Sequence, residues 1–250
     1  MFRLDGKVAL VTGAATGIGA GIATALARQG AHIAISDKPG VSLEETTAAA
    51  RAHGVRVFSL ELDVRDAGQR TNGVAAVTPE LGRVDILVNN AGINRPMSAL
   101  DVTEDNWDDH YATNVKGGFF LAQRLAPQMI EQGWGRVIWV ASQSGLIAVP
   151  GQPAYCSSKG AVIQAVRSLG LEWAKHGITV NAVAPTFVET NLTRARLQNP
   201  EFRAFVLGKI PVGRLAGVED VAACVVFLAS EEARMVNCHT LSVDGGWTAW

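Results

Sequence analysis

The chain of 250 residues has little of what marks secreted, metal-binding or nucleic-acid-binding proteins. Its three cysteines, Cys156, Cys224 and Cys238, have no paired spacing, which favours a reducing, cytoplasmic compartment. The five histidines are scattered and form no His-Glu-x-x-His or similar cluster, so we predict no catalytic metal. A net charge of −1, with 18% charged residues, indicates no basic surface for nucleic acid or anionic membranes.

Long apolar runs are also missing. Runs such as Val221–Ala229 are too short to cross a bilayer, so we expect no membrane partner. The first residues lead directly into a predicted strand and lack the apolar core of a signal peptide, so we expect no leader. Repeats, low-complexity tracts and shifts in composition are absent, and the length suits one large core. We therefore expect one domain over residues 1–250.

Short β-branched runs alternate with longer amphipathic stretches from one end of the chain to the other. The runs are almost continuously apolar, which indicates strands buried on both faces, as in a parallel sheet covered by helices. The alternation predicts a doubly wound α/β fold of the Rossmann type. The expected strands are Val8–Thr12, His32–Ser36, Arg56–Leu60, Ile86–Val88, Arg136–Ala141, Thr179–Ala184 and Leu241–Val243. The expected helices include Gly19–Gln29, Ser42–His53 and Ala161–Lys175.

Residues 186–212 interrupt this alternation. They carry polar side chains, Pro200 and Pro211, and show only weak periodicity. Ligands bind outside the carboxyl ends of the strands in such sheets, so we predict a substrate lid with short helices here. The alternative is a surface excursion that only packs on a neighbouring element.

A glycine-rich turn joins the first expected strand to the first helix. Gly13 permits the tight turn, Gly17 lets the backbone approach a pyrophosphate, and Gly19 permits close packing of the helix on the sheet. The helix N-terminus adds a favourable dipole for phosphate. A purely structural turn is the alternative. The turn predicts a dinucleotide site with contacts from Thr12, Gly13, Thr16, Gly17, Ile18 and Gly19.

Asp37 follows the second expected strand, at the distance from the glycines that suits a ribose contact. Its carboxylate can accept hydrogen bonds from both ribose hydroxyls of an adenosine and would repel a 2′-phosphate. Lys38 could partly offset that repulsion. Asp37 could instead only cap a loop. The sequence predicts NAD as the cofactor in preference to NADP.

Tyr155 and Lys159 are four residues apart, which places them one turn apart on one helix face. A phenol titrates near ~10 and is a poor acid or base at neutral pH. A nearby ammonium stabilises the phenolate and lowers that pKa, as a general acid/base requires. Ser142 lies upstream of the pair. Such pairs occur by chance in helices, but this one shares its chain with a nucleotide-binding turn.

These residues resemble the short-chain dehydrogenase/reductase family over essentially the whole chain. The matching elements, in the family's order, are Thr12-Gly-x-x-x-Gly-Ile-Gly19, Asp63-Val64, Asn89-Asn90-Ala91-Gly92, Asn114, Ser142, Tyr155-x-x-x-Lys159, Asn181 with Pro185, and Asp244-Gly245-Gly246. The resemblance implies a parallel sheet of seven strands in the order 3-2-1-4-5-6-7, with helices on both faces. It also implies hydride transfer between NAD(P) and an alcohol/carbonyl pair.

The same resemblance implies a role for each matching residue. Tyr155 would exchange a proton with the substrate oxygen, Lys159 would lower its pKa and bind the nicotinamide ribose, and Ser142 would orient that oxygen. Asn114 would hold a water in a proton relay. Asn90 could instead only tie strands together. The remaining implied cofactor contacts are Asp63, Val64, Asn90, Ala91, Gly92, Pro185, Val188 and Thr190.

Two positions depart from the family pattern. Thr186 stands where glycine usually follows the proline, and its side chain could reshape the wall near the nicotinamide or the lid hinge. Cys238 stands where glycine is common before the last strand, so the local backbone conformation is in question.

The substrate is less readable. Residues beside the catalytic set are rich in amides and hydroxyls, which favours a polyol, sugar or sugar acid over a steroid or long acyl chain. Besides Ser142 and Tyr155, the predicted substrate contacts are Asn94, Gln143 and Gln152.

Two other functions stay open. The first is a 3-oxoacyl-carrier-protein reductase, which usually takes NADPH and presents basic residues to an acidic carrier. Gly133 and His176 occupy the corresponding positions, and Asp37 also speaks against it. The second is an NAD-sensing protein without catalysis, which would not need Asn114, Ser142, Tyr155 and Lys159 together.

Assembly is expected from the family and from apolar residues. The segment Ala161–Trp173 offers small and apolar side chains, and Trp247 and Trp250 lie close together near the C-terminus. Exposed apolar surface of this kind is unusual, so we expect a homotetramer. The two tryptophans could equally complete their own subunit's core.

Overall fold

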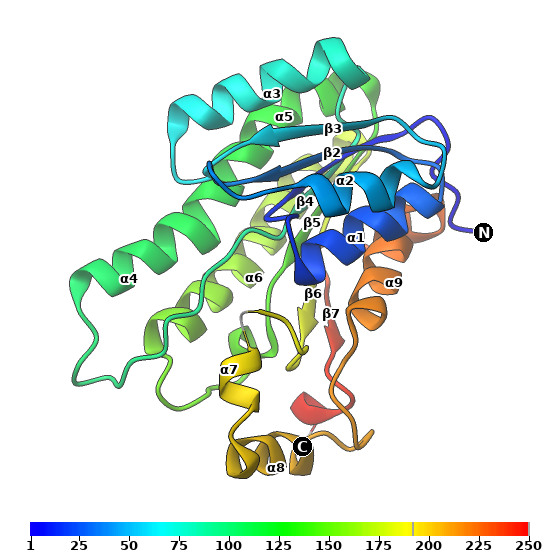
Figure 1. Cartoon of the computed structure of the whole chain (residues 1–250). Coiled ribbons are helices and arrows are strands. Elements are labelled where there is room, and N and C mark those ends of the chain that lie inside the picture. Colours follow the sequence, from blue (N-terminus) through cyan, green and yellow to red (C-terminus); the bar gives the residue numbers. More distant parts are fainter. Residues whose placement is uncertain (192, 250) are drawn as a thin grey trace.

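Seven parallel strands form one sheet in the order β3-β2-β1-β4-β5-β6-β7 in the computed structural model, which describes residues 1–191 and 193–249 (Figure 1). This confirms the predicted architecture and strand order. The strands are β1 (Val8–Thr12), β2 (His32–Asp37), β3 (Val57–Glu61), β4 (Ile86–Asn89), β5 (Gly135–Val140), β6 (Ile178–Pro185) and β7 (Thr240–Val243). β1 matches its predicted range, and the ends of the other strands differ from the predicted ones by at most one residue.

Helices cover both faces of the sheet (Figure 1). One face carries α1 (Gly17–Arg28), α2 (Glu44–Arg51) and α9 (Val218–Ala229). The other carries α3 (Ala67–Leu81), α5 (Gly118–Gln132) and α6 (Pro153–Trp173). Two separate hydrophobic clusters result, one on each side of the strands.

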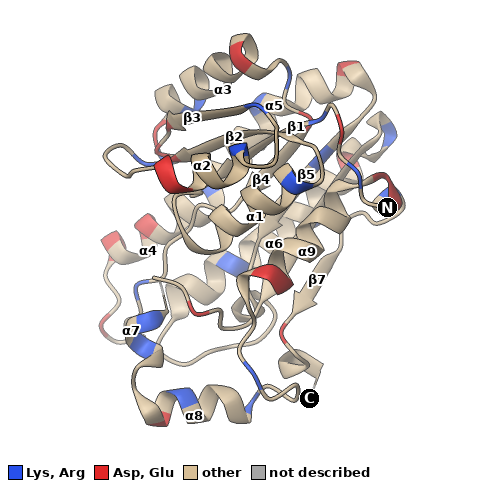
Figure 2. Cartoon of the chain, turned by 45° about the vertical axis from the view of Figure 1, so that its right-hand side comes forward, with Lys and Arg blue, Asp and Glu red and all other residues tan. Residues whose placement is uncertain are grey.

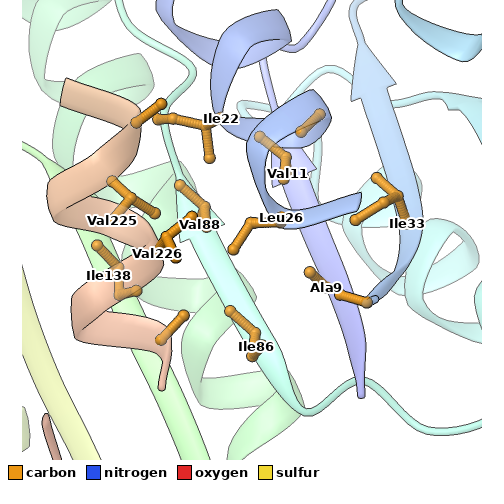
Figure 3. Close-up of a cluster of buried hydrophobic side chains, with 14 of the residues drawn as sticks. Ala9, Val11, Ile22, Leu26, Ile33, Ile86, Val88, Ile138, Val225 and Val226 are labelled. Carbon is orange, nitrogen blue, oxygen red and sulfur yellow. The ribbon is translucent and has the colours of Figure 1, made fainter. Parts of the chain in front are cut away.

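The cluster under α1 and α9 shows why these segments are helical. Ile22 and Leu26 are four residues apart, so both point from α1 onto the sheet (Figure 3). Val225 and Val226 of α9 meet them from the neighbouring helix. All four side chains are at most 6% exposed. Their burial fixes α1, and therefore the glycine turn that precedes it, against the strands.

Helix α6 begins at Pro153, well before the Ala161 at which the sequence pattern placed it. Proline is favoured at the first helical position because its missing N–H would be unpaired there in any case. The earlier start puts Tyr155 in the first turn and Lys159 in the second. The helix ends at Trp173 and is followed by a 3-10 turn over Ala174–His176.

The segment 186–212 folds into two short helices, α7 (Arg194–Leu197) and α8 (Pro200–Gly208). Asn199 caps α8 by accepting a hydrogen bond from the Phe202 amide, and Pro200 occupies its first position. The segment has its own small hydrophobic cluster, separate from the two that flank the sheet. Trp247 completes this cluster from the C-terminal end of the chain and is 8% exposed.

Cys238 adopts a left-handed backbone conformation, with a φ of 58°. Glycine adopts this conformation without strain, and other residues do so rarely. The departure seen in the sequence therefore lies at a position whose backbone favours glycine. The Cys238 side chain packs against α6 at Gly170, where an added Cβ would lie 2.6 Å from the sulfur.

Acidic and basic residues are interspersed over the elements of the fold (Figure 2). No helix within residues 1–191 and 193–249 is long and apolar enough to cross a membrane. Over the same residues, the acidic, histidine and cysteine side chains form no group that could hold a metal ion. Trp250, named above for assembly, lies outside the described residues.

Candidate active site

A cleft runs along the carboxyl ends of the strands, lined by segments that follow β1 to β6. This is the edge where ligands bind in doubly wound sheets. The cleft brings together most of the residues predicted from the sequence. These are Gly13, Thr16, Gly17, Ile18, Gly19, Asp37, Asp63, Val64, Asn90, Ala91, Gly92, Ser142, Tyr155, Lys159, Pro185, Val188 and Thr190.

The floor of the cleft begins at the glycine turn. Gly13 and Gly17 have φ values of 62° and 60°, which explains the glycines. A side chain at Gly13 would also lie 2.8 Å from the Cα of Ala91. A methyl group at Gly19 would overlap the Gly13 carbonyl oxygen and the Asn90 side-chain amide, which lie directly after β1 and β4. A glycine here therefore lets the start of α1 approach the carboxyl ends of these strands closely, in line with its predicted role.

Thr12 and Asn90 tie this turn to the end of β4. The Asn90 side-chain amide donates to the carbonyl oxygens of Thr12 and Gly13, at 2.9 and 2.8 Å. The Thr12 hydroxyl accepts from the amides of Asn90 and Ala91, each at 3.1 Å. Thr12 is 1% exposed and does not line the cleft, so its place is behind the wall. Asn90 both joins the strands and lines the cleft.

Asp37 lies at the end of β2 with its carboxylate fixed by two backbone amides. One oxygen accepts from Ala15 at 3.1 Å and the other from Lys38 at 2.9 Å. Lys38 also lines the cleft. The carboxylate is thus held at the place where β2 meets the glycine turn.

An ion-pair chain follows the rim of the cleft and was not foreseen from the sequence. Arg65 pairs with Asp63 at 2.7 Å and with Asp109 at 3.6 Å, and Asp109 also pairs with Arg95. The Arg65 guanidinium lowers the pKa of the Asp63 carboxyl through its hydrogen bonds. Arg65 and Arg95 both line the cleft. The ion pairs of Asp109 with Arg65 and Arg95 join residues that are far apart in the chain. Patterns in a single sequence do not reveal such contacts.

Tyr155 and Ser142 both line the cleft. Burial raises the pKa of Tyr155, and the neighbouring Ser142 hydroxyl opposes that shift. The sequence predicted the opposite net direction, from the charge of Lys159. The Lys159 ammonium lies 5.7 Å from the centre of the tyrosine ring and donates to the Val140 carbonyl oxygen at 2.7 Å. Burial is the largest influence on the pKa of Tyr155.

Lys159 itself is 5% exposed, and burial lowers its pKa to about 8. A buried amine prefers its neutral form because the ammonium loses its hydration. Lys159 can therefore change its charge in a pH range that is accessible to the folded protein. This is a property expected of a group that exchanges protons.

Asn114 lies in a π-helical turn, Ala112–Gly117, between α4 (Glu104–Tyr111) and α5. Its side chain accepts from the Ile93 amide at 2.8 Å and donates to the Ser158 hydroxyl at 3.0 Å. A Cβ at Gly92 would lie 3.2 Å from the Asn114 oxygen and 3.6 Å from the Lys159 nitrogen. Asn114 therefore lies behind Gly92, near Lys159, and does not line the cleft.

Three predicted substrate residues lie outside the cleft lining. Asn94 donates to the Gln152 side-chain oxygen at 2.6 Å, while its own side-chain oxygen is buried without a partner among the described residues. Gln143 is 2% exposed. Polar residues of the lining instead include Arg95, Thr186 and Asn191. Thr186 thus lines the cleft at the position where the family usually has glycine.

Comparisons with known proteins agree with this geometry. The family described as Enoyl-(Acyl carrier protein) reductase matches residues 13–248. D-threitol dehydrogenase of Mycolicibacterium smegmatis is 42% identical, over 99% of this chain and 95% of its own. The 3-oxoacyl-acyl-carrier-protein reductase of Escherichia coli is 39% identical, over 98% of each chain.

A solved structure also closely resembles this chain in its fold. The gluconate 5-dehydrogenase of Burkholderia cenocepacia, crystallised with NADP and tartrate, has a TM-score of 0.94 and 35% identity, over 100% of this chain and 98% of its own. The chain therefore belongs to the short-chain dehydrogenase/reductase family, as its motifs indicated. It is an oxidoreductase of that family.

Proposed function

We propose that the protein oxidises a secondary alcohol of a polyol, sugar or sugar acid, with NAD as cofactor. The observation that carries this proposal is the arrangement at the inner part of the cleft. There Ser142 and Tyr155 line the same cleft, with the Lys159 ammonium 5.7 Å from the centre of the tyrosine ring. A proton-transfer group, an oxygen-orienting hydroxyl and a titratable amine meet beside a nucleotide turn.

Each side chain has a distinct task in such a reaction. Tyr155 removes the proton from the substrate hydroxyl as general base, or returns it as general acid in the reverse direction. Ser142 orients the substrate oxygen and stabilises charge that develops on it. Lys159 would bind the nicotinamide ribose, and its positive charge would lower the pKa of Tyr155 against the effect of burial. Asn114 would hold a water that relays the proton to solvent. Bound NAD would supply the acceptor for the hydride.

The residues of the cleft fit a dinucleotide. Thr16, Gly17, Ile18 and Gly19 line the cleft where the glycine turn leads into the N-terminus of α1, and a helix N-terminus favours a pyrophosphate. Asp37 presents a fixed carboxylate at the end of β2, which favours ribose hydroxyls over a 2′-phosphate. Lys38 and Arg65 lie in the same lining, and the Burkholderia relative binds NADP. We keep NAD as the proposed cofactor because the Asp37 carboxylate is fixed by two backbone amides, and because the Arg65 guanidinium is paired with Asp63 and Asp109.

The proposed substrate class rests on the lining and on the relatives. Arg95, Thr186 and Asn191 give the cleft polar groups beside the catalytic tyrosine. Relatives that act on D-threitol and gluconate are 42% and 35% identical over almost the whole chain. A 3-oxoacyl-carrier-protein reductase is the second candidate, since one such enzyme is 39% identical. Asp37 and the uncharged Gly133 weigh against it.

Two further expectations stay proposals. We propose that the segment 186–212 is a lid, since Thr190, Asn191 and Thr193 line the cleft beside α7. We also propose a homotetramer. Leu171 of α6 is 75% exposed and could contact a second copy, whereas Trp247 completes its own chain's cluster and gives no support.

Initial rates with NAD⁺ and NADP⁺, measured separately over a panel of polyols, sugars and sugar acids, test the proposal. The reverse assay uses a short 3-oxoacyl thioester with each reduced cofactor. We expect NAD⁺-dependent oxidation of at least one polyhydroxylated alcohol. Reduction of the thioester by NADPH, with the panel silent, would overturn both the cofactor and the substrate class.

A further inference from the structure

Three side chains of α4 contact a single residue of the loop that follows β4. Asn106, Asp109 and His110 are spaced so that they share one face of the helix. Asn106 donates to the Arg95 carbonyl oxygen at 3.2 Å, and the Arg95 amide donates to His110 at 3.1 Å. Asp109 pairs with the Arg95 guanidinium. One helix face thus holds the backbone and the side chain of a residue that lines the cleft.

His110 is fully buried, and its two ring contacts require the same protonation state. Its Nδ1 lies 2.6 Å from the Asn106 carbonyl oxygen, which can only accept, so Nδ1 carries the proton. Its Nε2 accepts from the Arg95 amide, so Nε2 carries none. An imidazolium would leave the Arg95 amide without an acceptor. The packing therefore selects the neutral ring with hydrogen on Nδ1.

The same ring packs against the catalytic tyrosine. The centres of the His110 and Tyr155 rings are 6.3 Å apart, in an edge-to-face arrangement with an angle of 70°. Such contacts have a preferred geometry and restrict the tyrosine ring. Asn114 also fixes the loop, through Ile93, but its contacts do not include the Tyr155 ring. His110 joins the loop wall directly to the side chain that moves the proton.

We propose that His110 is a positioning residue that fixes the cleft wall at Arg95 relative to the Tyr155 hydroxyl. The neutral Nδ1–H ring performs this task through its acceptor nitrogen on one side and its ring edge on the other. The inference rests on the proposed function in one respect, namely that Tyr155 transfers the proton. A small displacement between a substrate wall and a catalytic group is enough to reduce turnover strongly.

Two variants separate the acceptor from the ring. His110→Gln keeps a side-chain oxygen that can accept from the Arg95 amide, whereas His110→Phe keeps a ring and loses the acceptor. With the best alcohol of the panel, we expect His110→Phe to lower kcat/KM by roughly tenfold or more, and His110→Gln to recover most of the loss. NAD⁺ affinity should stay within about twofold of the wild type in both variants. His53→Gln, at an exposed histidine, is the matched control and should change neither constant.

Hydrogen exchange at the Arg95 amide gives a readout that needs no substrate. We expect slow exchange in the wild type and in His110→Gln, and fast exchange in His110→Phe. Nitrogen-15 spectra of labelled histidine should show the proton on Nδ1. If no alcohol of the panel is oxidised but this exchange pattern is observed, the proposed function is contradicted and the positioning of Arg95 by His110 is supported. Equal exchange in both variants, a proton on Nε2, or an equal loss of NAD⁺ affinity would overturn the inference.

Discussion

The floor of the cleft and the segment 186–212, the proposed lid, are built in different ways. The floor is backbone: the turn from Gly13 to Gly19, held by Thr12 and Asn90 and fixed by α1 on the sheet. The lid is two short, largely exposed helices held by a small cluster of their own, with aromatic contacts among Phe187, Phe202, Phe205 and Trp247. Backbone packed against backbone has little freedom, whereas a few side-chain contacts can open locally. Ligand affinity should therefore depend on the floor for the cofactor and on the lid for the substrate.

The largest expected effect is at Tyr155, which lines the cleft between the floor and the proposed lid. Tyr155→Phe should lower turnover by roughly 10³-fold, since it removes the acid/base and keeps the ring. NAD⁺ affinity, measured by the change in tryptophan fluorescence on binding, should stay nearly unchanged. Tyr111→Phe is the matched control, because Tyr111 is the other tyrosine of the chain and stacks on Trp107. Substantial turnover in Tyr155→Phe would contradict the role assigned here.

A methyl group at Gly19 tests the floor. Gly19→Ala places a Cβ against the Gly13 carbonyl oxygen and the Asn90 amide, so the turn must move. We expect a cost of about 1–3 kcal/mol in unfolding free energy and at least a hundredfold weaker NAD⁺ binding by titration calorimetry. Gly208→Ala, in the lid helix α8, has no atom within 4 Å of the new Cβ and should bind NAD⁺ normally. Equal NAD⁺ affinities in the two variants would remove the distinction between floor and lid.

Trp247 tests the lid. Trp247→Leu removes the ring that stacks on Phe187, with ring centres 5.8 Å apart, and should loosen α7 and α8. We expect the KM of the alcohol substrate to rise roughly tenfold while the NAD⁺ affinity stays within about twofold. Limited proteolysis should cut within residues 186–212 faster than in the wild type. Trp247→Phe retains a ring and should restore most of the protection; failure of both variants to change proteolysis would argue against a lid held by this cluster.

The smallest effect is expected at Cys238, remote from both regions. Cys238→Gly removes the strain of the left-handed backbone conformation. It also loses the packing of the sulfur on Gly170 and raises the conformational entropy of the unfolded chain. These terms oppose each other, so the unfolding free energy should stay within about 1 kcal/mol of the wild type. Urea unfolding measures this, and kcat/KM should not change. A large loss of activity would mean that this end of β7 reaches the cleft.

Local patterns in the sequence were sufficient for the alternation of strands and helices, the glycine turn and the Tyr155–Lys159 pair, whereas the strand order came from the family resemblance. Each local feature depends on residues close together in the chain, such as the apolar run of β1 or the four-residue spacing on α6. The substrate wall could not be read in this way. Asn94 donates to Gln152, 58 residues away, a contact that local spacing does not predict, and both residues lie outside the cleft lining. The pKa of Tyr155 also escaped prediction, because its direction depends on burial rather than on spacing.

The amine of Lys159 has a consequence for how ligand binding is measured. With a pKa of about 8, roughly half of the molecules carry a neutral amine at that pH. Any ligand that prefers one form must take up or release a fraction of a proton when it binds. The heat of binding will then include the ionisation heat of the buffer. Titrations in buffers of different ionisation enthalpy would therefore measure how many protons are taken up or released when a ligand binds in the cleft.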